Sequence, residues 1–318
     1  MKIVVTRPIA QAGLAELLGH EVKVVDFGMT GPTEDRLIEE ARHAEALISM
    51  LSDPIGRRLF EACPRLKVVA QYAVGFDNID LEAARERGVI ITHTPDVLTN
   101  ATADFAFALF LAAARRIRLA DRYVRAGHFA RWETNLLLGL DLKDKVMGII
   151  GMGRIGSAMA RRAIGFGMRV VYHNRQRANP TIERVLSARF LSLDDLLRES
   201  DVVSLHCSLT PETRHLIDRK AFEKMKDTAI LVNTSRGAVV DESALVDALR
   251  ENQIDAAGLD VFENEPQLTP GLSDLENAVL APHLGSATVE ARTRMGKMCA
   301  EAILAVLEGA DQIPYRVA

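Results

Sequence analysis

Three polar segments of the sequence combine residue types that could act on a carbonyl group. They are NTSRGAVVDE (233–242), GLDVFENEP (258–266) and APHLGSAT (281–288), and each contains or follows a short apolar run. His283 can transfer a proton near neutral pH, and the carboxylate of Glu265 can orient its ring. The guanidinium of Arg236 can bind a carboxylate and polarise the neighbouring carbonyl. The three together predict the catalytic residues of a carbonyl-reducing site, although each alone has an ordinary structural explanation.

A glycine loop upstream of these segments could bind the phosphates of a dinucleotide. In GIIGMGRIGSAMARR, glycines at 151, 153 and 156 lie between an apolar run and a helical pattern. In such a unit the first glycine allows a tight turn, the second lets a pyrophosphate approach the backbone, and the third packs the helix on the strand. The helix N-terminus then favours the phosphates. The alternative is an ordinary turn between a strand and a helix.

The stretch VVYHNRQR (170–177) bears on which dinucleotide is bound. An Asp or Glu is expected about 20 residues beyond the glycines, where it would bind the ribose 2′-hydroxyl of NAD. No carboxylate occurs between Gly151 and Glu183, and Asn174, Arg175 and Arg177 occupy this region. Arginines attract the 2′-phosphate of NADP, so the sequence predicts that NADP is preferred. NAD remains possible, with Asn174 alone serving its ribose.

The elements that must position these residues form two series of alternating strands and helices. Such alternation is typical of βαβ units with a parallel sheet, where ligands bind beyond the carboxyl ends of the strands. The first series has expected strands at 2–5, 22–25, 46–49, 66–70 and 89–92, and expected helices at 9–18, 33–43, 55–62 and 81–87. The second series has expected strands at 145–151, 168–173, 201–206, 228–233, 255–260 and 278–283.

The predicted fold class is α/β, with two doubly wound parallel-sheet domains of the Rossmann or flavodoxin-like type. One long helix is expected from Thr99 to Ala126, ended by Gly127, and another from about Ala287 to Glu308. We interpret them as helices that cross between the domains. Residues 1–98 and 287–318 would then form the substrate domain, and residues 99–286 the dinucleotide-binding domain.

The composition is typical of a globular α/β protein and indicates no nucleic-acid, membrane or metal partner. The 318 residues carry a net charge of −4, which favours neither nucleic acid nor an anionic membrane. The longest apolar run is FAFALFLAAA (105–114). A helix that spans a membrane needs about 20 apolar residues, so this run is far too short. The three cysteines show no spacing typical of zinc, and no metal is predicted. A reduced, cytoplasmic protein is expected.

Over nearly its full length the sequence resembles the D-2-hydroxyacid dehydrogenases, most closely the glyoxylate/hydroxypyruvate reductases. The motifs that carry the resemblance are YAVGFDNID (72–80), ATADFAFALFLAAARR (101–116), GIIGMGRIG (148–156), LVNTSRGAVVDE (231–242), GLDVFENEP (258–266) and APHLGSAT (281–288). The resemblance implies an enzyme that reduces small 2-keto acids, glyoxylate and hydroxypyruvate, with a nicotinamide cofactor. It implies His283 as acid/base, Glu265 as its partner and Arg236 as the substrate-orienting cation.

The resemblance also implies binding residues in both domains. For the substrate they are Leu51, Val74, Gly75, Trp132, Arg236 and His283. For the cofactor they are Thr102, Gly151, Met152, Gly153, Arg154, Ile155, Gly156, Asn174, Arg175, Arg177, Cys207, Thr234, Ser235, Asp260 and Gly285. Asp260 would lie near the nicotinamide carboxamide, and the backbone of Val74 and Gly75 would meet the substrate carboxylate.

Two further features concern the substrate and the assembly. The segment QYAVG (71–75) lacks the basic residue that phosphoglycerate enzymes of this family carry there, which favours a small, unphosphorylated substrate. The segment around Trp132 resembles the dimer arm of these reductases, so a homodimer is expected, with or without contact of Trp132 to the partner's active site. Two alternatives stay open: a larger substrate such as 2-ketogluconate, and a corepressor-like protein that senses dinucleotides.

Overall fold

The protein forms two compact units in a computed structural model that describes residues 1–28 and 31–318. Unit 1 comprises Met1–Leu98 and Ala287–Ala318, and unit 2 comprises Thr99–Ser286. Each unit is built around a parallel β-sheet, as the alternating pattern predicts. The predicted fold class, two doubly wound α/β domains, is therefore confirmed.

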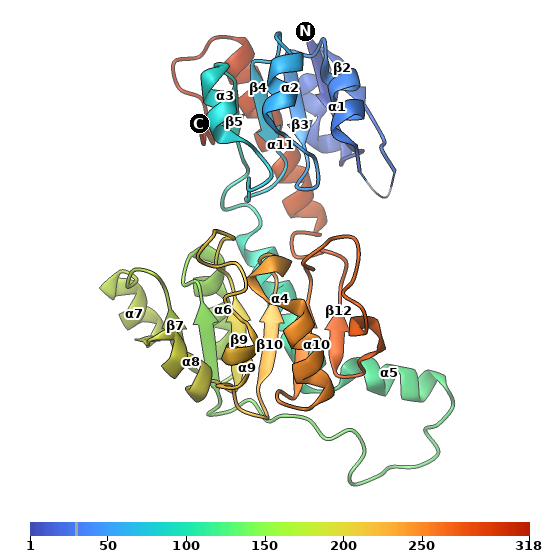
Figure 1. Cartoon of the computed structure of the whole chain (residues 1–318), viewed down its shortest axis with the longest axis vertical. Coiled ribbons are helices and arrows are strands. Elements are labelled where there is room, and N and C mark those ends of the chain that lie inside the picture. Colours follow the sequence, from blue (N-terminus) through green and yellow to red (C-terminus); the bar gives the residue numbers. More distant parts are fainter. Residues whose placement is uncertain (29–30) are drawn as a thin grey trace. The chain divides into compact units, whose positions relative to one another are not determined.

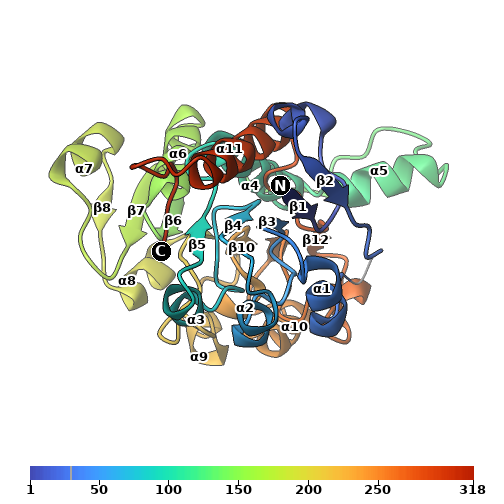
Figure 2. The same ribbon diagram turned by 90° about the horizontal axis from the view of Figure 1, so that it is seen from above.

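Unit 1 has a five-stranded parallel sheet in the order β2-β1-β3-β4-β5, the flavodoxin-like order. Its strands are β1 (Lys2–Val5), β2 (Glu21–Val24), β3 (Ala46–Ser49), β4 (Val68–Gln71) and β5 (Ile90–Thr92). Strands β3 and β4 are buried along their whole length, because helices cover both faces of the sheet. Figure 2 shows α1 (Glu34–Ala41), α2 (Arg57–Ala62) and α3 (Leu81–Glu86) on one side of these strands and α11 (Val289–Leu307) on the other.

The helix expected at 9–18 is wrong. The segment forms two short 3₁₀ turns, η1 (Gln11–Gly13) and η2 (Ala15–Leu17). A side chain at Gly13 would place its Cβ 2.9 Å from Cα of Gly296, so the two backbones touch. Glycine is a poor helix former, and packing against α11 favours the tighter turns.

Unit 2 has a seven-stranded parallel sheet in the order β12-β11-β10-β9-β6-β7-β8. Counted from β6, this is the Rossmann order with a seventh strand added at one edge. Its strands are β6 (Val146–Ile150), β7 (Arg169–His173), β8 (Arg189–Phe190), β9 (Val202–Leu205), β10 (Ile230–Asn233), β11 (Ala256–Leu259) and β12 (Ala278–Leu280). The two-residue β8 has no counterpart among the expected strands.

Two hydrophobic cores lie on the opposite faces of the unit 2 sheet (Figure 1). The first face is covered by α4 (Thr99–Ala114) and α6 (Arg154–Gly165), with α7 (Pro180–Leu186) beside α6. The second is covered by α8 (Leu193–Glu199), α9 (Arg219–Phe222) and α10 (Glu242–Arg250). Two-sided burial explains why the strands of unit 2 are continuous apolar runs rather than alternating ones.

The single long helix expected from Thr99 to Ala126 is also wrong, because it breaks after α4 and resumes as α5 (Ile117–Arg125). At the break Arg116 adopts a left-handed backbone conformation with φ of 52°. Two tertiary contacts lie there: Leu140 donates its N–H to the carbonyl of Ala114 at 2.9 Å, and Arg116 pairs with Asp255 at 2.8 Å. The alanine-rich sequence contains no helix breaker, so its local pattern could not indicate the break.

Candidate active site

The glycine loop lies where the strand order of unit 2 reverses, between β6 and β9. In doubly wound sheets this switch point is where ligands bind. Gly151 follows β6 with φ of +99°, a conformation that favours glycine. A Cβ at Gly151 would lie 2.6 Å from the backbone nitrogen of Cys207, which follows β9. The structure therefore brings together Gly151 and Cys207, two predicted cofactor residues separated by 56 positions.

The glycine loop has the open space that a pyrophosphate requires. A Cβ built on Gly153 meets no atom within 4 Å, whereas one on Gly156 would lie 2.2 Å from the carbonyl oxygen of Gly151. Helix α6 begins at Arg154, and its N-cap residue Gly153 offers no side chain to the first turn. The loop thus combines close packing on one side with exposed backbone at a helix N-terminus on the other. This arrangement fits the phosphates of a dinucleotide.

The amide of Asn174 is oriented by the glycine loop. Its Oδ1 accepts a hydrogen bond from the backbone N–H of Met152 at 2.7 Å. Since the acceptor end of the amide is engaged there, its NH₂ group remains as a donor. Arg175 follows on the exposed surface at the end of β7.

Arg177 has a carboxylate partner that sequence reasoning missed. Its guanidinium forms two hydrogen bonds with Glu183 of α7, at 2.7 and 2.9 Å. Glu183 also accepts a hydrogen bond from the hydroxyl of the fully buried Tyr172, and that hydroxyl accepts one from the N–H of Ala178 at 2.9 Å. The hydrogen bonds from Arg177 and Tyr172 hold the pKa of Glu183 below its usual value. The first acid after the glycine loop therefore pairs with an arginine of the same segment.

His283 and Glu265 are in direct contact in unit 2. Nδ1 of His283 lies 3.0 Å from Oε2 of Glu265, and their side chains are 32% and 38% exposed. Nε2 of His283 has no hydrogen bond from any described residue, so this nitrogen remains available to a bound molecule. The carboxylate determines which ring nitrogen carries the proton and how the ring is turned.

Charges and donors around Glu265 keep it ionised. Burial raises the pKa of Glu265, the hydrogen bond with His283 and the charge of that ring lower it, and the net result is a pKa below the usual value. A hydrogen bond from the N–H of Phe262, at 3.0 Å, and the positive charge of Arg236 act in the same direction. Arg236 is thus close enough to influence Glu265 electrostatically, and the three predicted catalytic residues share one region of unit 2.

Asp260 holds the loop that carries His283. Its two carboxylate oxygens accept the N–H groups of Leu284 and Gly285, at 2.6 and 2.7 Å, and its carbonyl oxygen accepts the N–H of His283 at 2.8 Å. His283 itself has φ of +56°. Burial raises the pKa of Asp260, whose side chain is 1% exposed within the described structure. We infer that Asp260 shapes the loop through its carboxylate. A Cβ on Gly285 would lie 3.3 Å from Thr102, so these two predicted cofactor residues are also neighbours.

The loop before Arg236 is held by Asn233, another residue that sequence reasoning missed. Oδ1 of Asn233 accepts both the N–H and the hydroxyl of Ser235, at 3.0 and 2.9 Å, and its Nδ2 donates to the carbonyl of Arg236 at 2.9 Å. Within the described chain, the hydroxyl of Thr234 is buried without a hydrogen-bond partner. A buried orphan hydroxyl is rare, and a polar group of a bound cofactor would satisfy it.

In unit 1 the predicted substrate residues lie on two neighbouring loops. Leu51 follows β3, and Val74 and Gly75 follow β4. The side chain of Asn78 joins the loops by donating to the carbonyl of Met50 at 3.0 Å. Since β3 and β4 are adjacent, the carboxyl ends of the strands bring these residues to one edge of the sheet.

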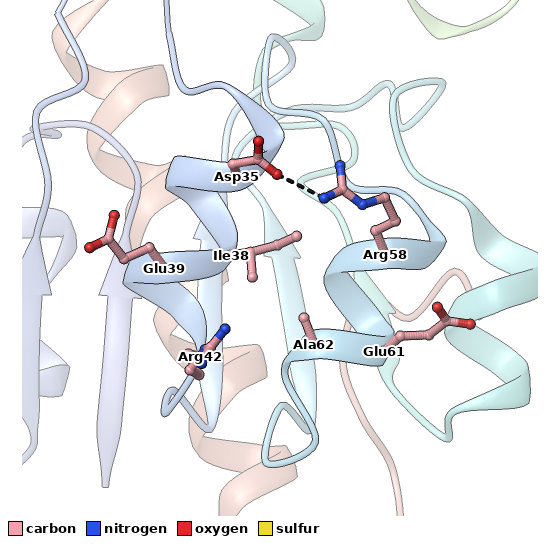
Figure 3. Close-up of a pocket in the computed structure, with 7 residues that line it drawn as sticks. All are labelled: Asp35, Ile38, Glu39, Arg42, Arg58, Glu61 and Ala62. Carbon is pink, nitrogen blue, oxygen red and sulfur yellow. Dashed lines mark hydrogen bonds and ion pairs between the residues drawn. The ribbon is translucent and has the colours of Figure 1, made fainter.

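A surface groove between α1 and α2 contains none of the predicted site residues (Figure 3). Charged side chains of both signs line most of it, and Arg58 pairs with Asp35 across it at 2.8 Å. Among residues 1–28 and 31–318, no cluster of three or more His, Cys, Asp or Glu side chains could hold a metal ion. None of the helices in this described part of the chain is long enough and apolar enough to cross a membrane.

Comparison with known proteins agrees with this geometry. The NAD-binding domain of the D-isomer specific 2-hydroxyacid dehydrogenases matches residues 107–285. A glyoxylate reductase of Korarchaeum cryptofilum is 50% identical over 311 residues, covering 97% of this chain and 93% of the relative. A Thermus thermophilus crystal structure matches with a TM-score of 0.93 and 48% identity, covering 100% of both chains.

A more distant structure is the NADPH-dependent glyoxylate/hydroxypyruvate reductase of Sinorhizobium meliloti, solved with NADP and malonate. It has a TM-score of 0.86 and 30% identity, and the match covers 100% of this chain and 96% of that one. The glycine loop at the switch point, the open space beside Gly153 and the matched domain together indicate a nicotinamide dinucleotide as the cofactor. The chain belongs to the D-isomer specific 2-hydroxyacid dehydrogenase family and is an NAD(P)-dependent dehydrogenase.

Proposed function

We propose that the protein reduces small 2-keto acids, glyoxylate and hydroxypyruvate, to D-2-hydroxy acids, with NADPH as the preferred cofactor. The observation that carries the proposal is the contact of His283 with Glu265 in the same region as Arg236. The printed names of the relatives, glyoxylate reductase and glyoxylate/hydroxypyruvate reductase, support this substrate class. Oxidation of NADPH that depends on added glyoxylate is the direct test, and binding of NADPH without turnover would favour the dinucleotide-sensing alternative.

In this proposal each of the three residues has one task. When bound, a nicotinamide cofactor would supply the hydride for the carbonyl carbon. His283 holds a proton at Nε2 and gives it to the carbonyl oxygen as negative charge develops there. Glu265 holds Nδ1–H and stabilises the protonated ring before the transfer. Arg236 binds the substrate carboxylate and polarises the adjacent carbonyl.

In unit 1, the loops after β3 and β4 are proposed to contribute substrate-binding residues. The backbone of Val74 and Gly75 would receive the carboxylate, and Leu51 would limit the space around the carbon chain. Residues 71–75 include no Lys or Arg, so no cation is present there to attract a phosphorylated substrate. Comparing kcat/KM for glyoxylate, hydroxypyruvate and 2-ketogluconate tests this, and a clear preference for 2-ketogluconate would favour the larger-substrate alternative.

We expect Arg175→Ala to lower the preference for NADPH over NADH by about ten- to a hundredfold. A hydrogen bond to a charged group contributes about 1.5–3 kcal/mol, which corresponds to that range. Arg177→Ala is the matched control. The guanidinium of Arg177 is already held by Glu183, so its removal is expected to change the cofactor preference much less. The measurement is the ratio of kcat/KM for the two cofactors with glyoxylate.

Two outcomes would contradict this assignment. A wild-type preference for NADH would mean that Asn174 serves an unphosphorylated ribose. A larger effect of Arg177→Ala than of Arg175→Ala would mean that the phosphate takes Arg177 away from Glu183.

We also propose that the protein is a homodimer, built on α5 and the segment that follows it. None of the nine residues of α5 is buried. The exposed large apolar residues of this region are Ile117, Val124, Phe129, Trp132 and Leu138. We take these five exposed apolar residues together as the candidate patch, because large exposed apolar surfaces mark interaction sites.

Sedimentation velocity is expected to show a dimer for the wild type and a monomer for Phe129→Glu/Leu138→Glu. Val185→Glu on α7 is the control, because Val185 is 70% exposed and lies outside the patch. A wild type that sediments as an active monomer would rule out the arm as an interface. If Trp132→Ala stays dimeric but loses activity, the tryptophan contributes to the partner's site as well.

A further inference from the structure

Glu242 is a buried carboxylate that takes no part in the proposed catalytic step. It is the first residue of α10 and is 2% exposed. None of the described residues forms an ion pair with it. Burying a carboxylate without a cation costs free energy, so its hydrogen bonds must compensate.

Both oxygens of Glu242 hold the loop that carries Glu265. Oε1 accepts the backbone N–H of Glu263 at 2.8 Å, and Oε2 accepts the hydroxyl of Thr269 at 2.6 Å. These anchor points lie two residues before Glu265 and four residues after it. Glu242 therefore fixes the loop on both sides of the carboxylate that contacts His283.

The segment before Glu242 touches the same loop by its backbone. A Cβ on Gly237 would lie 1.9 Å from the carbonyl carbon of Phe262, so only glycine allows this approach. Gly237 directly follows Arg236. One segment, 236–242, thus carries the proposed substrate-binding arginine and anchors the loop of Glu265 at two places.

We propose that Glu242 is a positioning residue for Glu265, which keeps the Glu265 carboxylate on Nδ1 of His283. The chain of contacts runs from Glu242 to the backbone of Glu263 and the side chain of Thr269, and then through the loop to Glu265. This inference rests on the proposed acid/base role of His283. It adds a residue that touches neither substrate nor cofactor but determines where the catalytic carboxylate lies.

The electrostatic surroundings agree with a positional role. Burial raises the pKa of Glu242, the hydrogen bonds from Thr269 and Glu263 lower it, and the negative charges of Glu263 and Glu265 raise it, so that the pKa lies above its usual value. The charged or titratable groups around the loop are Arg214, His215, Arg236, Asp260, Glu263, Glu265 and His283. A second carboxylate at this place is unfavourable for the charge of Glu265, so its benefit lies in the two contacts.

The test compares Glu242→Ala with Glu242→Gln in glyoxylate reduction by the full-length protein. Alanine removes both anchors, and kcat is expected to fall about 10- to 100-fold because the catalytic groups lose their alignment. The acidic limb of the pH–rate profile is expected to move to higher pH, because Glu265 loses part of the contact with His283 that lowers its pKa. Glutamine can accept from Glu263 and donate to Thr269, so it should restore both kcat and the limb.

Asp201→Asn is a control for the change of a buried carboxylate in unit 2, because Asp201 also accepts a backbone N–H, from Val146 at 2.8 Å, but is paired with Lys226 and lies outside the catalytic loops. It is expected to lower stability without moving the pH limb. A Glu242→Ala enzyme with lowered Tm but normal kcat and pH profile would overturn the proposal. So would a Glu242→Gln enzyme as impaired as the alanine variant, since charge rather than position would then matter.

Thr269→Val provides a second variant if Glu242→Ala does not fold. It removes one anchor, and a smaller loss of kcat with the same direction of pH shift is expected; an unchanged profile would overturn the proposal. His283→Ala separates the two hypotheses. If that variant keeps its turnover, the proposed acid/base role fails; if it is inactive while Glu242→Ala and Thr269→Val are normal, only the positioning role fails.

Discussion

Replacing His283 by alanine is expected to lower kcat for glyoxylate reduction by about 10²- to 10⁴-fold while the affinity for NADPH is unchanged. This range is the typical contribution of a positioned proton donor. Cofactor affinity should persist because the glycine loop, at residues 151–156, is a separate part of unit 2. The measurements are steady-state kinetics and a fluorescence titration with NADPH.

His43→Ala is a suitable control, since His43 is exposed on unit 1 beyond the end of α1. Unchanged turnover in His283→Ala would contradict the assignment of the proton donor. A large loss of NADPH affinity in that variant would mean that the ring holds the cofactor rather than the proton.

The contact of His283 with Glu265 also sets the direction of a pH effect. Reduction requires the protonated ring, so the rate should fall as the pH rises. The ring loses its charged partner in Glu265→Gln, so kcat measured across the pH range should be lower than in the wild type. At low pH the wild-type contact should persist, because the lowered pKa of Glu265 keeps its carboxylate ionised below the usual range.

Replacing Arg236 by alanine is expected to lower kcat/KM for glyoxylate by about 10²- to 10⁴-fold. Two charge-assisted hydrogen bonds to a carboxylate contribute about 3–6 kcal/mol together, which corresponds to this range. Arg236→Lys should recover only part of the loss, because an ammonium cannot match a carboxylate with two parallel hydrogen bonds. Nδ2 of Asn233, which donates to the backbone of Arg236, should hold the loop in both variants, although Arg236→Ala loses the hydrogen bond from the guanidinium to the carbonyl of Ser235 at 2.7 Å.

A carboxylate-free carbonyl substrate isolates this role. With such a substrate the loss in Arg236→Ala should be smaller than with glyoxylate, because only the polarisation of the carbonyl is then missing and no carboxylate is there to bind. Arg219→Ala is the control arginine, since Arg219 pairs with Asp247 on the surface of unit 2. Equal losses with and without a substrate carboxylate would contradict the assignment and indicate that Arg236 supports Glu265 instead.

The local pattern of apolar residues was sufficient to predict the positions of most strands in the two sheets. Strand β3, Ala46–Ser49, falls where its apolar run predicts, and β6, β10 and β11 lie within one or two residues of the expected ranges. Buried parallel strands are short continuous apolar runs bounded by polar turns, so their position is encoded locally. Helix ends are harder to predict from local sequence. The helix breaks at Arg116, whose guanidinium pairs with Asp255, a residue 139 positions away.

The sequence by itself determined which residue types stand at the carboxyl ends of the unit 2 strands: the glycines after β6, Arg236 after β10, and Glu265 and His283 after β11 and β12. A parallel sheet brings such ends to one edge, so these residues could be named without a structure. Only the tertiary structure decided the partners. It paired Arg177 with Glu183 and placed Glu242 under the loop of Glu265, because contacts between separate segments depend on packing and burial, which no local spacing contains.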